Sequence, residues 1–260
     1  MTKDLYTIEE LTKKYIGIVQ EEYKDYIPKD IQEYLIENDS FVQYSEKGIS
    51  FYVRDGIVYL PKIAYEYFER IKTFPQYGTY PNKYRKVEDY LDTNTTYYDY
   101  IDHIVGDALT PLDYFKESLL HEVMHLCGSM GSDPLDEGFN ELKTRELASK
   151  YSIDIAAYGY PKEVEIAKKL EDIIGKETTD QLAFMDYTQK IDLLRSKNPD
   201  IANLYSSAHS KMIELSREYF DTLGDVNDPY VKADNYSKID YSEVHKMIDT
   251  FNDDKRVNRR

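Results

Sequence analysis

The sequence predicts an α+β fold that is mainly helical and carries a small β-sheet in its N-terminal part. Residues 41–60 are mostly β-branched or aromatic, which is the composition of strands. From about residue 110 onward, apolar side chains recur almost continuously at helical spacing. A chain of 260 residues is long enough for one large domain or two small ones.

Local signals set the expected elements of the N-terminal part. Pro28 and Asp30 interrupt a helical pattern, so two helices are expected before residue 38. Asp55-Gly56 is a strong two-residue turn signal and predicts a hairpin. Proline and glycine make much of residues 73–99 an expected loop. The expected strands are 41–45, 51–54 and 57–60, and a helix is expected at 61–72.

The C-terminal part is expected to be a series of amphipathic helices. Pro161 opens one of them and Gly175 closes it, because proline suits the first turn of a helix and glycine its end. Further helices are expected at 179–196, 200–223 and 239–251. These elements suggest an N-terminal subdomain at 1–128, a helical subdomain at 129–251 and a flexible basic tail at 252–260.

Composition restricts the class of partner. The net charge of −16 argues against nucleic acid, because phosphates would be repelled. We find no apolar run long enough for a transmembrane helix and no signal peptide, so a soluble, cytoplasmic protein without a membrane partner is expected. A secreted form that had lost its leader would look the same. The single cysteine, Cys127, suits a reducing compartment. Composition does not indicate an oligomeric state.

The most informative motif is His-Glu-x-x-His at residues 121–125. Two histidines four residues apart lie on the same face of a helix and can reach one metal ion. Pro111 suits the first turn of this helix and Gly128 its end, while Phe115, Leu119 and Val123 form an apolar stripe on the other side. Glu122 can accept a proton from metal-bound water. Cys127 falls on the apolar face, where a buried residue is expected rather than a ligand.

A catalytic zinc site needs a third protein ligand. The metzincin pattern requires a histidine six residues after the second histidine, but glycine occupies position 131. The next candidates are Glu137 and Glu141 on a second helix, which Asp133 can cap and Pro134 can open. One carboxylate could bind the metal while the other accepts the free N–H of a ligating histidine. Gly138 leaves room for close helix contact.

This arrangement resembles the gluzincins, the zinc peptidases that pair His-Glu-x-x-His with a glutamate on the next helix. Residues 135–139 resemble the Leu-Asn-Glu-Gly-Phe stretch of the zinc aminopeptidases. Glu137 followed by Glu141 resembles the Glu-x-x-x-Asp of the thermolysin-like enzymes. The resemblance covers residues 115–148 and implies a two-lobed, zincin-like metallopeptidase that binds one zinc ion per chain. The implied roles are metal ligand for His121, His125 and Glu137, general base for Glu122, and support of a histidine ligand for Glu141.

The spacing departs from the larger gluzincin families. Only 11 residues separate His125 from Glu137, which is a shorter spacer than those families have. The sequence therefore matches a minimal member of the group, and Glu141 stays an alternative third ligand.

Peptide hydrolysis also requires a donor that stabilises the developing oxyanion. Gluzincins use a tyrosine or histidine from the helical half, and the candidates here are Tyr158 and Tyr160, and His209 or Tyr205 on a later helix. The resulting hypothesis is a zinc-dependent peptidase that acts on peptide or protein substrates. The alternatives are a catalytically silent protein of the same fold that binds a partner, and a helical interaction module in which the motif occurs by chance.

Overall fold

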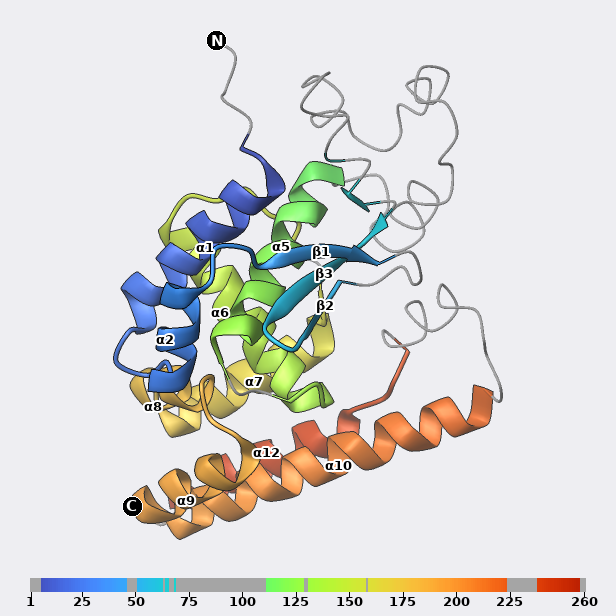
Figure 1. The fold of residues 1–260 in the computed structure, drawn as a ribbon. Coiled ribbons are helices and arrows are strands. Elements are labelled where there is room, and N and C mark those ends of the chain that lie inside the picture. The colour runs from blue at the N-terminus through green and yellow to red at the C-terminus, as the bar shows by residue number, and fades with distance from the viewer. Residues whose placement is uncertain are drawn as a thin grey trace. The chain divides into compact units, whose positions relative to one another are not determined.

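The structure is a computed structural model of the chain, shown in Figure 1. It describes residues 6–45, 51–62, 64, 65, 68, 111–128, 131–157, 159–223 and 238–257. Within these residues, nine helices and one three-stranded sheet confirm the mainly helical α+β class. The loop expected at 73–99 and most of the helix expected at 61–72 lie outside the described residues. No described helix is long and apolar enough to cross a membrane.

The chain divides into two compact units. Unit 1 comprises Met1–Cys127 and Thr144–Gly159, and unit 2 comprises Gly128–Lys143 and Tyr160–Arg260. Residues 144–159 had been expected with the C-terminal helices. They belong to unit 1 because Lys150 and Tyr151 both bond to Glu22 of the first helix.

Unit 1 begins with two helices, α1 (Ile8–Tyr23) and α2 (Lys29–Glu37). Thr7 and Glu10 form a capping box at the start of α1, so each side chain satisfies a backbone N–H of the other. Three strands follow, β1 (Val42–Ser45), β2 (Tyr52–Arg54) and β3 (Ile57–Pro61). These bounds confirm the break near Pro28 and the three expected strands.

The sheet has the order β1-β3-β2, with β3 parallel to β1 and antiparallel to β2. Asp55 and Gly56 both have positive φ, at 51° and 76°, as a tight turn between hairpin strands requires. The Tyr34 hydroxyl donates a hydrogen bond to the carbonyl of Gly56 at 3.1 Å, which joins α2 to this turn.

Helix α5 (Pro111–Cys127) packs against α1 and β3 within unit 1. Its apolar stripe is fully buried, and the Phe115 ring stacks on Phe68 with centroids 4.6 Å apart. Burying a large apolar side chain contributes roughly 1.5–3 kcal/mol, so this stripe anchors the helix firmly. The face that carries the histidines is also covered, because His121 and Glu122 are less than 9% exposed.

Helix α6 (Pro134–Lys150) runs from unit 2 into unit 1. Unit 2 continues through α7 (Pro161–Ile174), α8 (Lys176–Leu182), α9 (Tyr187–Lys197), α10 (Pro199–Leu223) and α12 (Ser242–Val257). Their buried faces meet in one apolar core that includes Leu135, Leu170 and Tyr205.

Two expectations for unit 2 were wrong. The single helix expected at 179–196 is broken, because Asp186 and Gln189 form a capping box that starts α9 anew. The flexible tail expected from residue 252 is also shorter, since α12 continues to Val257.

Candidate metal centre

Helix α5 presents both histidines of the motif on one face. The imidazole centroids of His121 and His125 lie 5.0 Å apart, with the ring planes at 70° to each other. His121 is buried and His125 is half-buried. Covered imidazoles on a well-packed helix have little conformational freedom, which favours binding of one shared ion.

Asp133 starts helix α6. Its Oδ1 atom accepts hydrogen bonds from the backbone N–H groups of Leu135 and Asp136, both at 3.1 Å. Its backbone carbonyl accepts the first helical hydrogen bond, from the N–H of Glu137 at 2.9 Å. With Pro134 as the first helical residue, this confirms the expected cap and places Glu137 at the end of the first turn.

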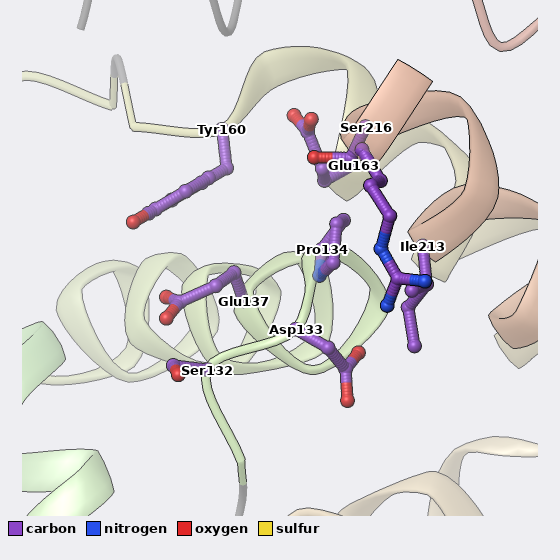
Figure 2. Close-up of a pocket in the computed structure, with 9 residues that line it drawn as sticks. Ser132, Asp133, Pro134, Glu137, Tyr160, Glu163, Ile213 and Ser216 are labelled. Atoms are coloured by element: carbon purple, nitrogen blue, oxygen red, sulfur yellow. The ribbon is translucent and has the colours of Figure 1, made fainter. Parts of the chain in front are cut away.

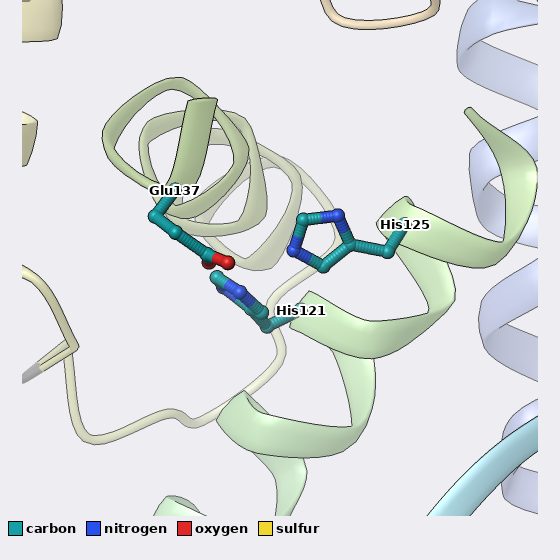
Figure 3. Close-up of side chains that lie close together, drawn as sticks. All are labelled: His121, His125 and Glu137. Carbon is teal, nitrogen blue, oxygen red and sulfur yellow. The ribbon is translucent and has the colours of Figure 1, made fainter. Parts of the chain in front are cut away.

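His121, His125 and Glu137 form a group that could hold a metal ion, shown in Figure 3. Each residue offers a ligand atom, and these atoms all lie within 4.8 Å of one another. A tetrahedral ion with bonds of about 2.1 Å holds its ligand atoms about 3.4 Å apart, so small side-chain rotations would suffice. Glu141 is 1% exposed and does not belong to this group.

A buried ion pair lies directly beside Glu137 in the sequence. Lys190 of α9 donates to Asp136 Oδ1, and both residues are no more than 3% exposed. The other oxygen, Oδ2, accepts the N–H of Gly131 at 3.0 Å. Burial raises the pKa of the Asp136 carboxyl, an effect that the charge of Lys190 opposes. The pair therefore fixes the start of α6 against α9, and sequence analysis did not find it.

His209 of α10 interacts with the cap of α6. Its Nε2 atom lies 2.9 Å from Asp133 Oδ2, and its ring stacks on Tyr187 with centroids 4.4 Å apart. Burial alone would raise the pKa of Asp133, but the hydrogen bonds from His209 and from the Asp136 backbone, together with the nearby charge of Lys190, lower it overall. His209 was a candidate oxyanion donor. In the structure it contacts Asp133, the residue that caps α6.

Gly138 allows α6 to approach α7 closely, as expected. A Cβ atom at this position would lie 2.5 Å from the carbonyl oxygen of Glu163 and 2.6 Å from its carbonyl carbon. Such distances are well inside van der Waals contact. Any residue other than glycine would therefore push α6 and the first turn of α7 apart, next to Glu137.

A cavity of about 470 Å³ lies within unit 2 and includes Glu137 in its wall (Figure 2). Tyr160 lines the same cavity, and His209 does not. Tyr160 precedes α7 and adopts a left-handed backbone conformation, with φ of 49°. Tyr158 lies outside the described residues. The remaining lining residues are Ser132, Asp133, Pro134, Glu163, Ile213, Ser216 and Arg217.

Glu117 holds the loop that leads to Tyr160. It lies one helical turn before His121 on α5 and is buried, and its Oε1 accepts the N–H of Gly159 at 2.9 Å. Arg145 of α6 donates to the carbonyl of the same glycine. The four-residue step from Glu117 to His121 was visible in the sequence, but the partner in a distant loop was not.

Comparisons with known proteins give no match: no family model, no curated protein and no solved structure matches this chain. Inferences about function therefore depend on the residues and geometry described above.

Proposed function

We propose that this chain is a zinc-dependent peptidase of gluzincin type with a zincin-like fold. The observation that carries the proposal is the group of His121, His125 and Glu137, whose ligand atoms lie within 4.8 Å of one another. Two imidazoles and a carboxylate are a ligand set of catalytic zinc, with the fourth position open. Glu137 is the third ligand in this proposal, since Glu141 does not belong to the group.

Zinc, when bound, would act as a Lewis acid and lower the pKa of a coordinated water to about 7. Glu122 occupies the position between the histidines, in the order that zinc peptidases use for a general base. It accepts a proton from the attacking water and returns that proton to the leaving amine. The substrate in this proposal is a peptide or protein, whose scissile carbonyl a bound zinc ion would polarise.

The oxyanion that forms during hydrolysis needs a hydrogen-bond donor. Tyr160 is our candidate because it lines the same cavity as Glu137. Glu117 and Arg145 fix the neighbouring Gly159 from two sides, which gives the start of this segment a defined position. The role of Glu141 is to support a histidine ligand, which its complete burial favours.

Metal content tests the ligand assignment. The wild-type protein, purified without chelators, is expected to contain one zinc ion per chain by elemental analysis. Glu137→Ala is expected to lose the ion, whereas Glu141→Ala should retain it with affinity reduced about 10- to 100-fold. Zinc retained in Glu137→Ala and lost in Glu141→Ala would reverse the assignment. A stoichiometric metal other than zinc, such as iron, would refute the zinc site.

Activity tests the chemistry separately. Glu122→Gln is expected to retain zinc and to lose peptidase activity on a mixture of peptides. The isosteric change removes the base and leaves the packing of α5 intact. Full activity in this variant would exclude Glu122 as the base. Stoichiometric zinc with no turnover by the wild type would favour a catalytically silent binding protein.

A further inference from the structure

The cavity beside Glu137 contains a carboxyl group that is unusually placed. Glu163 lies in the first turn of α7, lines the cavity and is 2% exposed. Its Oε1 atom is buried and has no hydrogen-bond partner among the described residues. Leaving a buried polar atom without a partner costs free energy, and a ligand that supplies a donor there would recover it.

The nearby cations do not neutralise Glu163. Lys162 is its chain neighbour, but the Lys162 Nζ atom donates to the carbonyl of Ile239 at 2.7 Å. Burial raises the pKa of the Glu163 carboxyl, although hydrogen bonds from its own backbone and from Tyr241, and the charge of Lys162, act in the opposite direction. A cation brought by a ligand would therefore interact strongly with this group, because water screens it little.

Arg217 also lines the cavity and would favour an anion instead. It is exposed, whereas Glu163 is buried, so water screens the charge of Arg217 much more effectively. Asp133, the other acidic residue of this wall besides Glu137, is paired with His209. Of these charged groups, Glu163 therefore offers a ligand the largest gain in binding free energy.

We propose that this cavity binds a positively charged side chain of the substrate, arginine or lysine, and that Glu163 recognises its charged end. This proposal rests on the proposed peptidase function, because it assigns a specificity pocket to that active site. Ile213 and Pro134 supply apolar wall for the methylene stem of such a side chain. Glu137 belongs both to the cavity wall and to the metal-binding group, so the recognised residue would lie next to the scissile bond.

A binding experiment tests the pocket without requiring turnover. N-acetyl-arginine amide and N-acetyl-citrulline amide have nearly the same shape, but only the first is charged. Their affinities for the zinc-loaded Glu122→Gln protein are measured by isothermal titration calorimetry. We expect the arginine amide to bind about 10- to 100-fold more tightly, as a charged hydrogen bond to a buried partner predicts.

Two variants test whether the preference for the arginine amide depends on Glu163. In Glu163→Gln, the preference for arginine over citrulline should fall to less than about threefold, with zinc content and thermal unfolding as controls for folding. In Arg217→Gln, the preference should persist or grow, because a like charge is removed. N-acetyl-aspartate amide binding more tightly than either probe, and losing that affinity in Arg217→Gln, would overturn the proposal in favour of an anion pocket.

The results separate the two proposals. Arginine binding that depends on Glu163, in a wild-type protein that cleaves no peptide, would support the pocket and refute the peptidase. Equal binding of arginine and citrulline amides would refute the pocket, whether or not peptides are cleaved. If peptides are cleaved, a preference for basic residues that disappears in Glu163→Gln would support both proposals together.

Discussion

The close approach of α6 and α7 at Gly138 predicts the effect of adding a single methyl group. In Gly138→Ala, the new Cβ atom would lie 2.5 Å from the backbone oxygen of Glu163. Ordinary contact requires at least about 3.4 Å, so the two helices must separate by nearly 1 Å. Overpacking of this kind costs about 1–3 kcal/mol, and backbone atoms cannot rotate away as a side chain can.

Helix propensity acts in the opposite direction. Alanine is favoured over glycine by about 1 kcal/mol in the interior of a helix. The matched control is Gly17 in α1, which is exposed and would meet no atom within 4 Å of an added Cβ. Gly17→Ala should therefore raise the melting temperature by about 2–4 °C, while Gly138→Ala should lower it by up to about 8 °C.

Thermal unfolding followed by circular dichroism measures both variants, and zinc titration follows on the folded proteins. The reasoning also predicts weaker zinc binding in Gly138→Ala, because Glu137 is the preceding residue. Gly17→Ala should bind zinc as the wild type does. Gly138→Ala with a melting temperature raised as much as that of Gly17→Ala would refute the close approach of these helices.

Two further predictions concern buried charges. Lys190→Met leaves Asp136 buried without its cation, so it should destabilise the protein by about 3–5 kcal/mol in urea unfolding. The control is Arg195→Met, which breaks an exposed ion pair and should change the free energy of unfolding by less than about 1 kcal/mol. Equal effects of the two variants would contradict the buried pair. The pKa of Glu171 is lowered although burial alone would raise it, because hydrogen bonds from Lys143 and Thr179 and the positive charges of Lys143 and Lys176 together outweigh burial. Its contribution to stability is therefore present above the unfolded pKa of about 4.3 and is lost as pH falls. Glu171→Gln should be less stable than the wild type at pH 7, and the difference should shrink steadily as pH falls below about 4.3; a difference that stays constant down to the acid transition would contradict the assignment.

Sequence signals that act over a few residues were sufficient for most of the fold. Asp55-Gly56 specified a turn because few other residue pairs accept two consecutive positive φ angles. Asp133 and Pro134 specified the start of α6. The Asp133 side chain accepts hydrogen bonds from N–H groups of the first turn, and Pro134 has no N–H that would need a partner there. The break before α9 had the same kind of signal, an Asp186–Gln189 capping box within a continuous apolar pattern.

Pairings between distant residues could not be predicted in this way. His209 meets Asp133 across 76 residues, and Lys190 meets Asp136 across 54. Periodicity shows which face of a helix is apolar, but it does not say which helix will cover that face. The candidate metal ligands were accessible to sequence reasoning because their geometry depends on local helical spacing. The residues that hold those ligands in position were not accessible.

The short spacer between His125 and Glu137 gives this candidate centre a distinctive electrostatic setting. Because α5 ends at Cys127 and α6 begins at Pro134, the candidate ligand lies in the first turn of its helix. The positive end of the helix dipole stabilises carboxylates there, and Asp133 and Asp136 occupy the same turn. Within unit 2, Lys190 balances the charge of Asp136, and His209 forms a hydrogen bond with Asp133. A divalent cation bound by the two histidines would balance the third carboxylate, which is why loss of zinc should loosen the first turn of α6 more than the rest of that helix.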